Sequence, residues 1–346
     1  FRLALLIFFV IITILDRTFS LLNEFIYQLN PSKLFILCDE NTHEYCLPIL
    51  LPNMEINCPF EIIEIEAGEE MKTIETATQL WEILTEFEAD RKALLLNLGG
   101  GVITDMGGFV ASTYKRGIKF INLPTSLLGM CDASIGGKTG IDHQFIKNIV
   151  GTFALPERIF VFSNFLKTLP FRELKSGFAE MIKHGLIADK KHWDDLINLP
   201  EISVGYIQPH IEASMKIKEN IVHIDYHEKN IRKVLNFGHT IGHAVESLFL
   251  EEDEIIPHGF AIAYGMICET QLSYLEGFIS KNTTEKIINN IRKFYTDIKL
   301  PFNKDKIIIK MMNDKKNTHG NINFTLLSEI GEGIYDVQCK DENILS

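Results

Sequence analysis

A short apolar run that stops at three consecutive glycines constrains the fold of this chain more than any other stretch. Four leucines between positions 94 and 98 lead directly into Gly99-Gly100-Gly101. Such a run is typical of a buried strand, and glycines at its end leave backbone amides where a ligand can approach closely. Segment 102–112 is predicted to be a helix whose first amides face the same ligand. A lone glycine cluster is more often a tight turn, so the interpretation depends on the surrounding sequence.

The sequence after the glycines favours a ligand site. A second apolar run, 118–123, stops at Pro124-Thr125-Ser126. Lys138 and Lys147 then follow in glycine-rich or apolar surroundings. A nucleotide-type turn with cationic groups close by indicates a phosphorylated substrate beside a dinucleotide.

The sequence before the glycines indicates the fold around this turn. Strand-like runs occupy 34–38 and 62–65, and segment 73–87 is amphipathic. Alternating strands and helices are the mark of a parallel α/β sheet, so we expect a Rossmann-like domain. Asp39 directly follows the first of these strands. That position either contacts the ribose or adenine of a dinucleotide or caps the next helix.

Length and charge limit the class of protein. A chain of 346 residues exceeds the usual size of a single core, so two domains are expected. The net charge of -12 argues against a nucleic-acid partner, and an anionic substrate must therefore be attracted by a local cluster of Lys and Arg. Six widely spaced cysteines without a CxxC pair are typical of reduced thiols in a cytoplasmic protein.

The N-terminal stretch 1–15 is apolar from Leu3 to Leu15. It is too short to span a bilayer, which takes about 20 residues. No small-residue cleavage site follows it. We therefore expect a mis-started reading frame or a buried N-terminal strand, and no membrane partner.

Helical periodicity dominates the second half of the chain. Helices are predicted at 172–187, 207–224, 234–249, 261–275 and 284–295, with a late strand at 322–327. The fold class is therefore an α/β dinucleotide-binding domain, 1–163, followed by a mainly α-helical metal- and substrate-binding domain, 164–346.

The helical half contains a histidine pair. His239 and His243 are four residues apart, so both imidazoles project from one face of a helix and suit a divalent metal such as zinc. Histidines facing solvent or bonded in a core are the alternative, but the glycines beside this pair favour a site. Glu180 and His258 could complete a ligand set with an open coordination position. Which histidines bind stays open.

These motifs together resemble the 3-dehydroquinate synthase family, the NAD- and metal-dependent cyclases of the shikimate pathway. The resemblance is carried by GEEMK, GGGVITD, YKRG, PTSLL, CDASIGGKTG, AEMIKHG, RKVLNFGHTIGHA and PHG. Phe260 departs from the family pattern, which frequently has Glu after the His-Gly of the last motif.

The resemblance implies a role for individual residues. Zinc, or cobalt in its place, would be held by Glu180, His239 and His258. The NAD site would comprise Asp39, Asn41, Glu69, Lys72, Gly100, Gly101, Val102, Asp105, Thr125, Ser126, Lys147 and Thr168. The substrate site would comprise Asp132, Lys138, Asn148, Lys183, Lys218, Arg232, Asn236, His243 and Lys315. Arg116 would reach into a neighbouring subunit's site, which implies a homodimer.

The implied activity is that of a carbon–oxygen lyase acting on a sugar phosphate. It converts 3-deoxy-D-arabino-heptulosonate 7-phosphate into 3-dehydroquinate and phosphate by transient oxidation, elimination, re-reduction and aldol closure. The rivals are a cyclase similar to 2-deoxy-scyllo-inosose synthase, a polyol or glycerol-1-phosphate dehydrogenase, and a non-enzymatic relative. The intact set of lysines and metal ligands favours dehydroquinate formation. Lys218 lies on an otherwise charged helix, where a solvated surface charge is the alternative.

Overall fold

The computed structural model describes residues 10–144, 146–252, 254, 256–296, 304–312 and 322–344. The chain divides into two compact units, Phe1–Leu169 and Pro170–Ser346. The sequence pattern placed this boundary after Ser163. Phe165 explains the later position, because its ring packs against Phe19 and Phe162 of the first unit.

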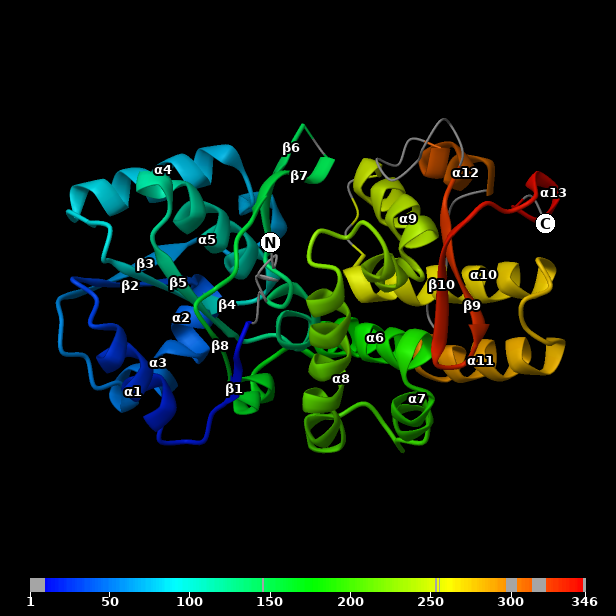
Figure 1. Ribbon diagram of the computed structural model, residues 1–346, viewed down its shortest axis with the longest axis horizontal. Helices are drawn as coiled ribbons and strands as arrows, with labels where there is room; N and C mark the ends of the chain where they lie inside the picture. Colours follow the sequence, from blue (N-terminus) through cyan, green and yellow to red (C-terminus); the bar gives the residue numbers. More distant parts are fainter. Residues whose placement is uncertain are drawn as a thin grey trace, which may run out of the picture. The chain divides into compact units, whose positions relative to one another are not determined.

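The first unit is built on a six-stranded parallel sheet (Figure 1). Its strands, in spatial order, are β1 (Ile12–Ile14), β8 (Ile159–Val161), β5 (Lys119–Pro124), β4 (Leu94–Gly99), β2 (Leu34–Asp39) and β3 (Phe60–Ile65). The central strands are buried almost throughout, as expected for a parallel sheet covered on both faces.

Helices cover the two faces of this sheet. They are α1 (Ser20–Leu29), α2 (Glu40–Tyr45), α3 (Leu47–Leu50), α4 (Ile74–Glu86) and α5 (Gly101–Thr113). Short helical turns link them: η1 (Leu51–Asn53), η2 (Glu69–Met71), η3 (Tyr114–Arg116), η4 (Gly129–Ala133) and η5 (Ser163–Lys167). Figure 1 shows α4 and α5 on one face and α1 and α3 on the other. The predicted Rossmann-like architecture is confirmed.

The order of the strands positions a ligand crevice. From β2 the chain moves to β3 on one side and then to β4 on the other, so the strand order reverses between β2 and β4. In open α/β sheets, ligands bind outside the carboxyl ends of the strands at such a switch point. Asp39 ends β2 and Gly99 ends β4, so both residues lie there.

An antiparallel hairpin, β6 (Lys138–His143) and β7 (Ile146–Phe153), follows the sheet's glycine-rich loops. The sequence pattern did not predict it, because glycines interrupt the alternation of apolar residues. Gly140 pairs with Gly151 in the hairpin, and Thr139 packs closely over Gly108 of α5. The hairpin is therefore held against the helix that begins at the glycine turn.

The N-terminal apolar stretch forms an edge strand where it is described. β1 pairs in parallel with β8, and Val10 and Leu15 on either side of it are buried. The strand alternative thus holds for Ile12–Ile14, but the strand is only partly buried, with Ile14 45% exposed.

The second unit is mainly helical. It contains α6 (Phe171–Ala188), α7 (Lys190–Ile197), α8 (Val204–Ile224), the turn η6 (Ile231–Asn236), α9 (His239–Glu251), α10 (His258–Leu275), α11 (Lys281–Phe294), α12 (Lys304–Met312), an antiparallel hairpin of β9 (Phe324–Glu329) and β10 (Glu332–Val337), and α13 (Asp341–Ile344). The sequence pattern did not predict α7, α12, β10 or α13. The late strand begins at Phe324, two residues after the predicted start.

One predicted helix, 234–249, is wrong in its first part. The chain breaks at Phe237 and Gly238, and α9 begins only at His239. Gly238 has a φ of +81°, a left-handed conformation that glycine adopts without strain and that ends helical continuity.

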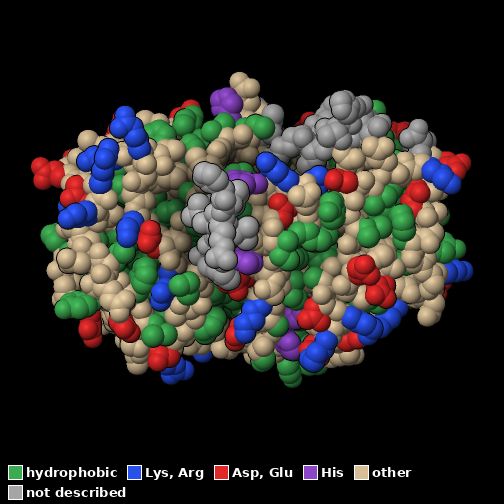
Figure 2. Space-filling view, viewed as in Figure 1, with side chains coloured by type: hydrophobic (Ala, Val, Ile, Leu, Met, Phe, Trp, Pro, Cys, Tyr) green, Lys and Arg blue, Asp and Glu red, His purple; other side chains and the backbone are tan. Residues whose placement is uncertain are grey.

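The surface carries mixed charge. Figure 2 shows Lys and Arg side chains interspersed with Asp and Glu on the face in view, so the negative net charge is not gathered there into one patch. Among the described helices, none is long and apolar enough to cross a membrane.

Candidate cofactor and metal sites

The glycine turn between β4 and α5 forms a tight backbone cradle. Gly100 is the N-cap residue of α5, and the Gly99 carbonyl accepts the backbone N–H of Thr125 at 3.0 Å. A Cβ on Gly100 would lie 3.3 Å from Ser126 Oγ, and one on Gly101 would lie 3.3 Å from Ala133 Cβ. The turn therefore leaves the first amides of α5, including that of Val102, at the switch point, where an anionic group fits a helix N-terminus.

Asp39 acts as a helix cap in the structure. Its Oδ1 accepts the backbone N–H of Thr42 at 2.8 Å, and the Thr42 hydroxyl accepts the backbone N–H of Asp39 at 2.9 Å. This reciprocal pair is a capping box at the start of α2. Asn41 lies exposed in the first turn of the same helix. Capping and contact with a ribose are compatible roles for this carboxylate, and the second remains a prediction.

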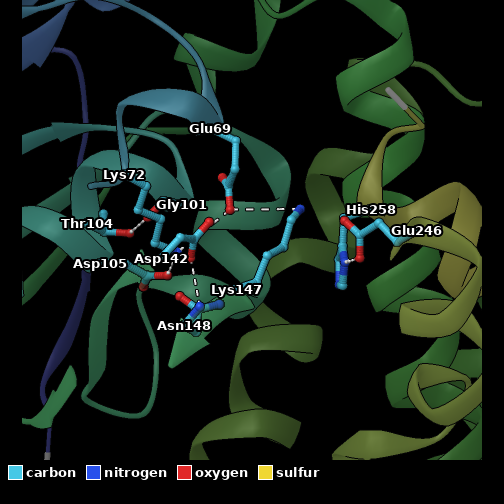
Figure 3. Close-up of polar contacts among 10 residues, drawn as sticks. All are labelled: Glu69, Lys72, Gly101, Thr104, Asp105, Asp142, Lys147, Asn148, Glu246 and His258. Carbon is cyan, nitrogen blue, oxygen red and sulfur yellow. Dashed lines mark hydrogen bonds and ion pairs between the residues drawn. The ribbon is translucent and has the colours of Figure 1, made fainter. Parts of the chain in front are cut away.

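A buried ion pair lies beside the cradle (Figure 3). Lys72 is 3% exposed, and its Nζ lies 2.7 Å from Asp105 Oδ2 and 4.0 Å from Glu69 Oε1. Burial disfavours the charged amine, but the Asp105 and Glu69 carboxylates outweigh it and raise the pKa of Lys72. Lys147 Nζ lies 3.8 Å from Glu69 Oε1, so four predicted NAD-site residues meet here.

Asp142 links this network to a predicted substrate residue, and the sequence analysis missed it. Its Oδ1 accepts the backbone N–H of Asn148 at 2.7 Å, and its own backbone N–H donates to the Lys72 carbonyl at 2.7 Å. Asn148 has a φ of +52°, which is uncommon for a residue other than glycine. Asp142 thus holds a strained residue in place. Only the backbone geometry reveals this role, so the sequence offered no signal for it.

The other predicted residues of the first unit are dispersed over its loops. Thr168 directly follows η5, and its hydroxyl donates to the Phe165 carbonyl at 3.1 Å. Asp132 lies half-buried in η4, and Lys138 is exposed at the start of β6. Arg116 is exposed at the end of η3, with a φ of +68° that follows a left-handed Lys115.

Three helices of the second unit bring the predicted metal ligands together. Glu180 lies on α6, His239 begins α9 and His258 begins α10. Glu180 Oε1 lies 3.9 Å from His239 Nε2 and 3.6 Å from His258 Nε2. One ligand atom from each residue lies within 4.8 Å of the other two. Two imidazoles and a carboxylate are donors that suit a divalent cation such as zinc and leave a coordination position open.

Close contact between α6 and α10 explains this convergence. A Cβ on Gly259 would lie 1.9 Å from the Ser176 carbonyl oxygen, so only glycine allows the two backbones to approach this closely. The Ser176 hydroxyl also accepts the Gly259 backbone N–H at 2.9 Å. Ser176 precedes Glu180 by one helical turn, so the contact places His258 beside that carboxylate.

Glu246 of α9 orients His258. His258 Nδ1 lies 3.3 Å from Glu246 Oε2, whereas Nε2 faces Glu180 (Figure 3 shows the first contact). Burial opposes protonation of His258, but Glu246 and Glu180 outweigh it and raise the pKa of His258 to about 10. His243, Glu246 and His258 also form a group whose ligand atoms lie within 4.8 Å of one another. The bond to Glu246 favours the set with Glu180, because it leaves Nε2 of His258 for a metal.

The predicted substrate cations of the second unit are buried. Lys183, Lys218 and Arg232 are 1%, 7% and 3% exposed. The alternative for Lys218, a solvated surface charge, is therefore wrong, because α8 turns this lysine inward. Lys183 forms an ion pair with Glu180. Asn236 donates to Glu228 Oε1 at 3.0 Å, and Lys315 lies outside the described residues.

His243 lies beside the metal group, and its role in the substrate site stays a prediction. Its ring centroid is 5.1 Å from that of His239 and 5.9 Å from that of His258. The structure therefore brings both members of the HxxxH pair to one place.

The fold of this chain is similar to that of several solved structures. A crystal structure of 2-deoxy-scyllo-inosose synthase, complexed with carbaglucose-6-phosphate, NAD+ and Co2+, has a TM-score of 0.83 at 24% identity and covers 96% of this chain and 94% of that one. The 2-epi-5-epi-valiolone synthase of Streptomyces hygroscopicus, with NAD+ and Zn2+ bound, has a TM-score of 0.84 at 23% identity and covers 97% and 94%. Glycerol dehydrogenase from Schizosaccharomyces pombe is more distant, with a TM-score of 0.63 and 13% identity over 90% and 85%.

Sequence comparison identifies the family. The family model of the 3-dehydroquinate synthase N-terminal region matches residues 62–176, and that of the C-terminal region matches residues 177–317. The 3-dehydroquinate synthase of Parabacteroides distasonis is 41% identical over 330 residues, 94% of this chain and 93% of that protein. The enzyme of Campylobacter hominis is 42% identical over 288 residues, 83% of each. The chain belongs to the 3-dehydroquinate synthase family.

Proposed function

We propose that this member of the 3-dehydroquinate synthase family converts 3-deoxy-D-arabino-heptulosonate 7-phosphate into 3-dehydroquinate and phosphate, with NAD and a divalent cation, preferably zinc, as cofactors. The observation that carries the proposal is the convergence of Glu180, His239 and His258 from three helices. Relatives that are 41% and 42% identical and bear this name support the choice of reaction.

The residues present fit both cofactors. Backbone amides at the N-terminus of α5 and a cradle narrowed by Ser126 and Ala133 fit the diphosphate of a dinucleotide. Two imidazoles and one carboxylate, all largely buried, fit a zinc or cobalt ion. When bound, NAD supplies a reversible hydride acceptor, and the cation polarises the hydroxyl group that is oxidised.

The side chains of the second unit bind and orient the substrate in this proposal. Lys183, Lys218 and Arg232 present buried positive charge, which stabilises the carboxylate and phosphate of a dianionic sugar acid. His243 and Asn236 donate hydrogen bonds that hold the phosphate in the orientation of elimination.

The side chains of the first unit hold the cofactor in place. Lys72 and Asp105 fix the start of α5 and η2 relative to one another, because their buried pair spans the two elements. Asp142 holds the backbone of Asn148. The cofactor-binding turn is therefore preorganised before the substrate arrives.

We also propose a cytoplasmic homodimer. The support for the dimer is Arg116, which is exposed on a left-handed turn and therefore projects from its own unit. The support for the cytoplasm is the set of free cysteines, which are typical of a reducing compartment.

Phosphate release from the heptulosonate phosphate tests the function. We expect release to require both NAD and a divalent cation, and to stop with a chelator. Absorbance at 340 nm separates the rivals, because a cyclase regenerates NAD in each turnover. NADH that accumulates in step with consumed substrate would instead identify a dehydrogenase.

A further inference from the structure

The peptide unit between Phe237 and Gly238 is held at both of its polar ends. Its carbonyl, on Phe237, lies 3.2 Å from His239 Nδ1, and its N–H, on Gly238, donates to Glu269 Oε2 at 2.5 Å. A carbonyl oxygen only accepts hydrogen bonds, so the His239 nitrogen in this contact carries the proton. Nε2 of His239 is then the nitrogen left to face Glu180.

Glu269 is a fully buried carboxylate on α10. Its second oxygen, Oε1, accepts the backbone N–H of Ile241 at 3.2 Å. Both oxygens therefore bind amides at the start of α9, where the helix dipole favours negative charge. Neither the motifs of the sequence nor the roles implied by the family resemblance single out this residue.

We propose that Glu269 is a positioning residue for the metal ligand His239 and acts through the Phe237–Gly238 peptide. The inference rests on the metal site of the proposed function. Glu269 fixes the plane of this peptide by holding its N–H. The peptide carbonyl in turn fixes the ring orientation and the Nδ1–H tautomer of His239.

The chain of contacts also tunes the ligand. A carboxylate that accepts the peptide N–H polarises the peptide and strengthens its carbonyl as an acceptor. A stronger acceptor for Nδ1–H raises the basicity of Nε2 and so makes it a better metal ligand. Hydrogen-bond partners of metal-bound histidines generally have this effect. The left-handed Gly238 makes this geometry possible, because a Cβ there would lie 2.8 Å from the Ile262 carbonyl oxygen.

Glu269→Gln is the sharpest variant, because it keeps the shape of the side chain. A glutamine offers one oxygen and one NH2 group to two N–H donors, so one donor loses its acceptor. We expect the folded variant to bind Zn2+ about 10- to 100-fold more weakly than wild type. The measurement is Zn2+ titration of metal-depleted protein in competition with a chelating dye, below the melting temperature of each variant.

Glu276→Gln is the matched control at the other end of α10. Its Oε1 accepts the backbone N–H of Lys340 and the side-chain amide of Asn343, each at 2.9 Å. Both donors bind one oxygen, which a glutamine keeps, so the variant makes the same chemical change away from the metal group without removing an acceptor. We expect it to leave zinc affinity unchanged. Equal zinc affinity in wild type and folded Glu269→Gln would overturn the positioning role.

A measurement on the wild-type protein covers the case in which Glu269→Gln does not fold. Nitrogen NMR of histidine-labelled, metal-depleted protein reports the tautomer of His239, and we expect the proton on Nδ1. A proton on Nε2 instead would overturn the inference. Wild-type protein that binds no zinc at all would overturn the proposed metal site itself, which is a different result from unchanged affinity in the variant.

Discussion

The two units form their sites in different ways. In the first unit, the candidate cofactor site uses backbone amides where β4 ends and α5 begins; of its two lysines, Lys147 is partly exposed and Lys72 is buried. In the second unit, the candidate metal site consists of side chains from three helices, and its cations are buried. A backbone site tolerates side-chain changes that do not disturb the turn. A side-chain site depends on each member, so single substitutions should affect the second unit more.

His239→Ala should have the largest effect. It removes one of three metal ligands, so we expect metal affinity to fall by more than about 100-fold, the upper range for residues that only support a ligand. Elemental analysis of the desalted protein measures this, and NAD binding should persist because Gly100 and Gly101 are unchanged. His223→Ala, an exposed position on α8, is the control and should keep its metal. A full zinc complement in His239→Ala would remove this residue from the ligand set.

Lys72→Met tests whether a side chain also matters in the first unit. It leaves Asp105 without its buried partner, and we expect the free energy of unfolding to fall by about 3 kcal/mol. The stabilisation is fully present below the unfolded pKa of 10.5 and is lost as the pH rises through the raised folded value. Urea unfolding at several pH values measures both effects.

Lys119→Met provides the matched comparison for Lys72→Met. Lys119 and Glu157 form an ion pair on the surface, with side chains 48% and 39% exposed. An exposed pair contributes little, so the stability should hardly change. Equal losses of unfolding free energy in the two variants would mean that the buried Lys72 pair stabilises the fold no more than the exposed pair does.

Arg116→Ala should reduce turnover by about 10- to 100-fold, the range for a lost hydrogen bond to a charged group. Dimerisation should persist in sedimentation measurements. Mixing this variant with His239→Ala tests whether the arginine acts across subunits. Random pairing at equal concentrations makes about half of the dimers mixed, and each mixed dimer holds one complete site out of two. Activity should therefore recover to about a quarter of wild type. An arginine that served its own subunit would give no recovery.

Asp142→Ala should have the smallest effect. It removes one acceptor for the Asn148 backbone N–H, worth about 1 kcal/mol, so we expect KM for the substrate to rise about fivefold. Asp142→Asn keeps an oxygen acceptor and should remain near wild type. If both variants raise KM equally, the charge of Asp142 rather than its hydrogen bond is responsible.

The central strands and the glycine turn were predictable from the sequence. Strand β4 and helix α5 follow from a leucine run, three glycines and an apolar helix, which are all local signals. The hairpin β6–β7 was missed because its glycines hide the alternation that identifies strands. The predicted helix 234–249 failed at Gly238, whose left-handed backbone follows from its packing against α10.

For the candidate site too, local signals in the sequence determined one part and tertiary packing determined the other. The sequence by itself determined the types of residue available: glycines after a strand, an HxxxH pair, and lysines in apolar surroundings. Only the tertiary structure decided that Glu180 and His258 meet His239, that Lys218 is buried, and that Asp142, Glu246 and Glu269 support the site. The physical reason is the distance along the sequence over which the deciding interactions act. A turn or a helix face is set by neighbouring residues, whereas the meeting of side chains from distant helices is set by how closely those helices pack.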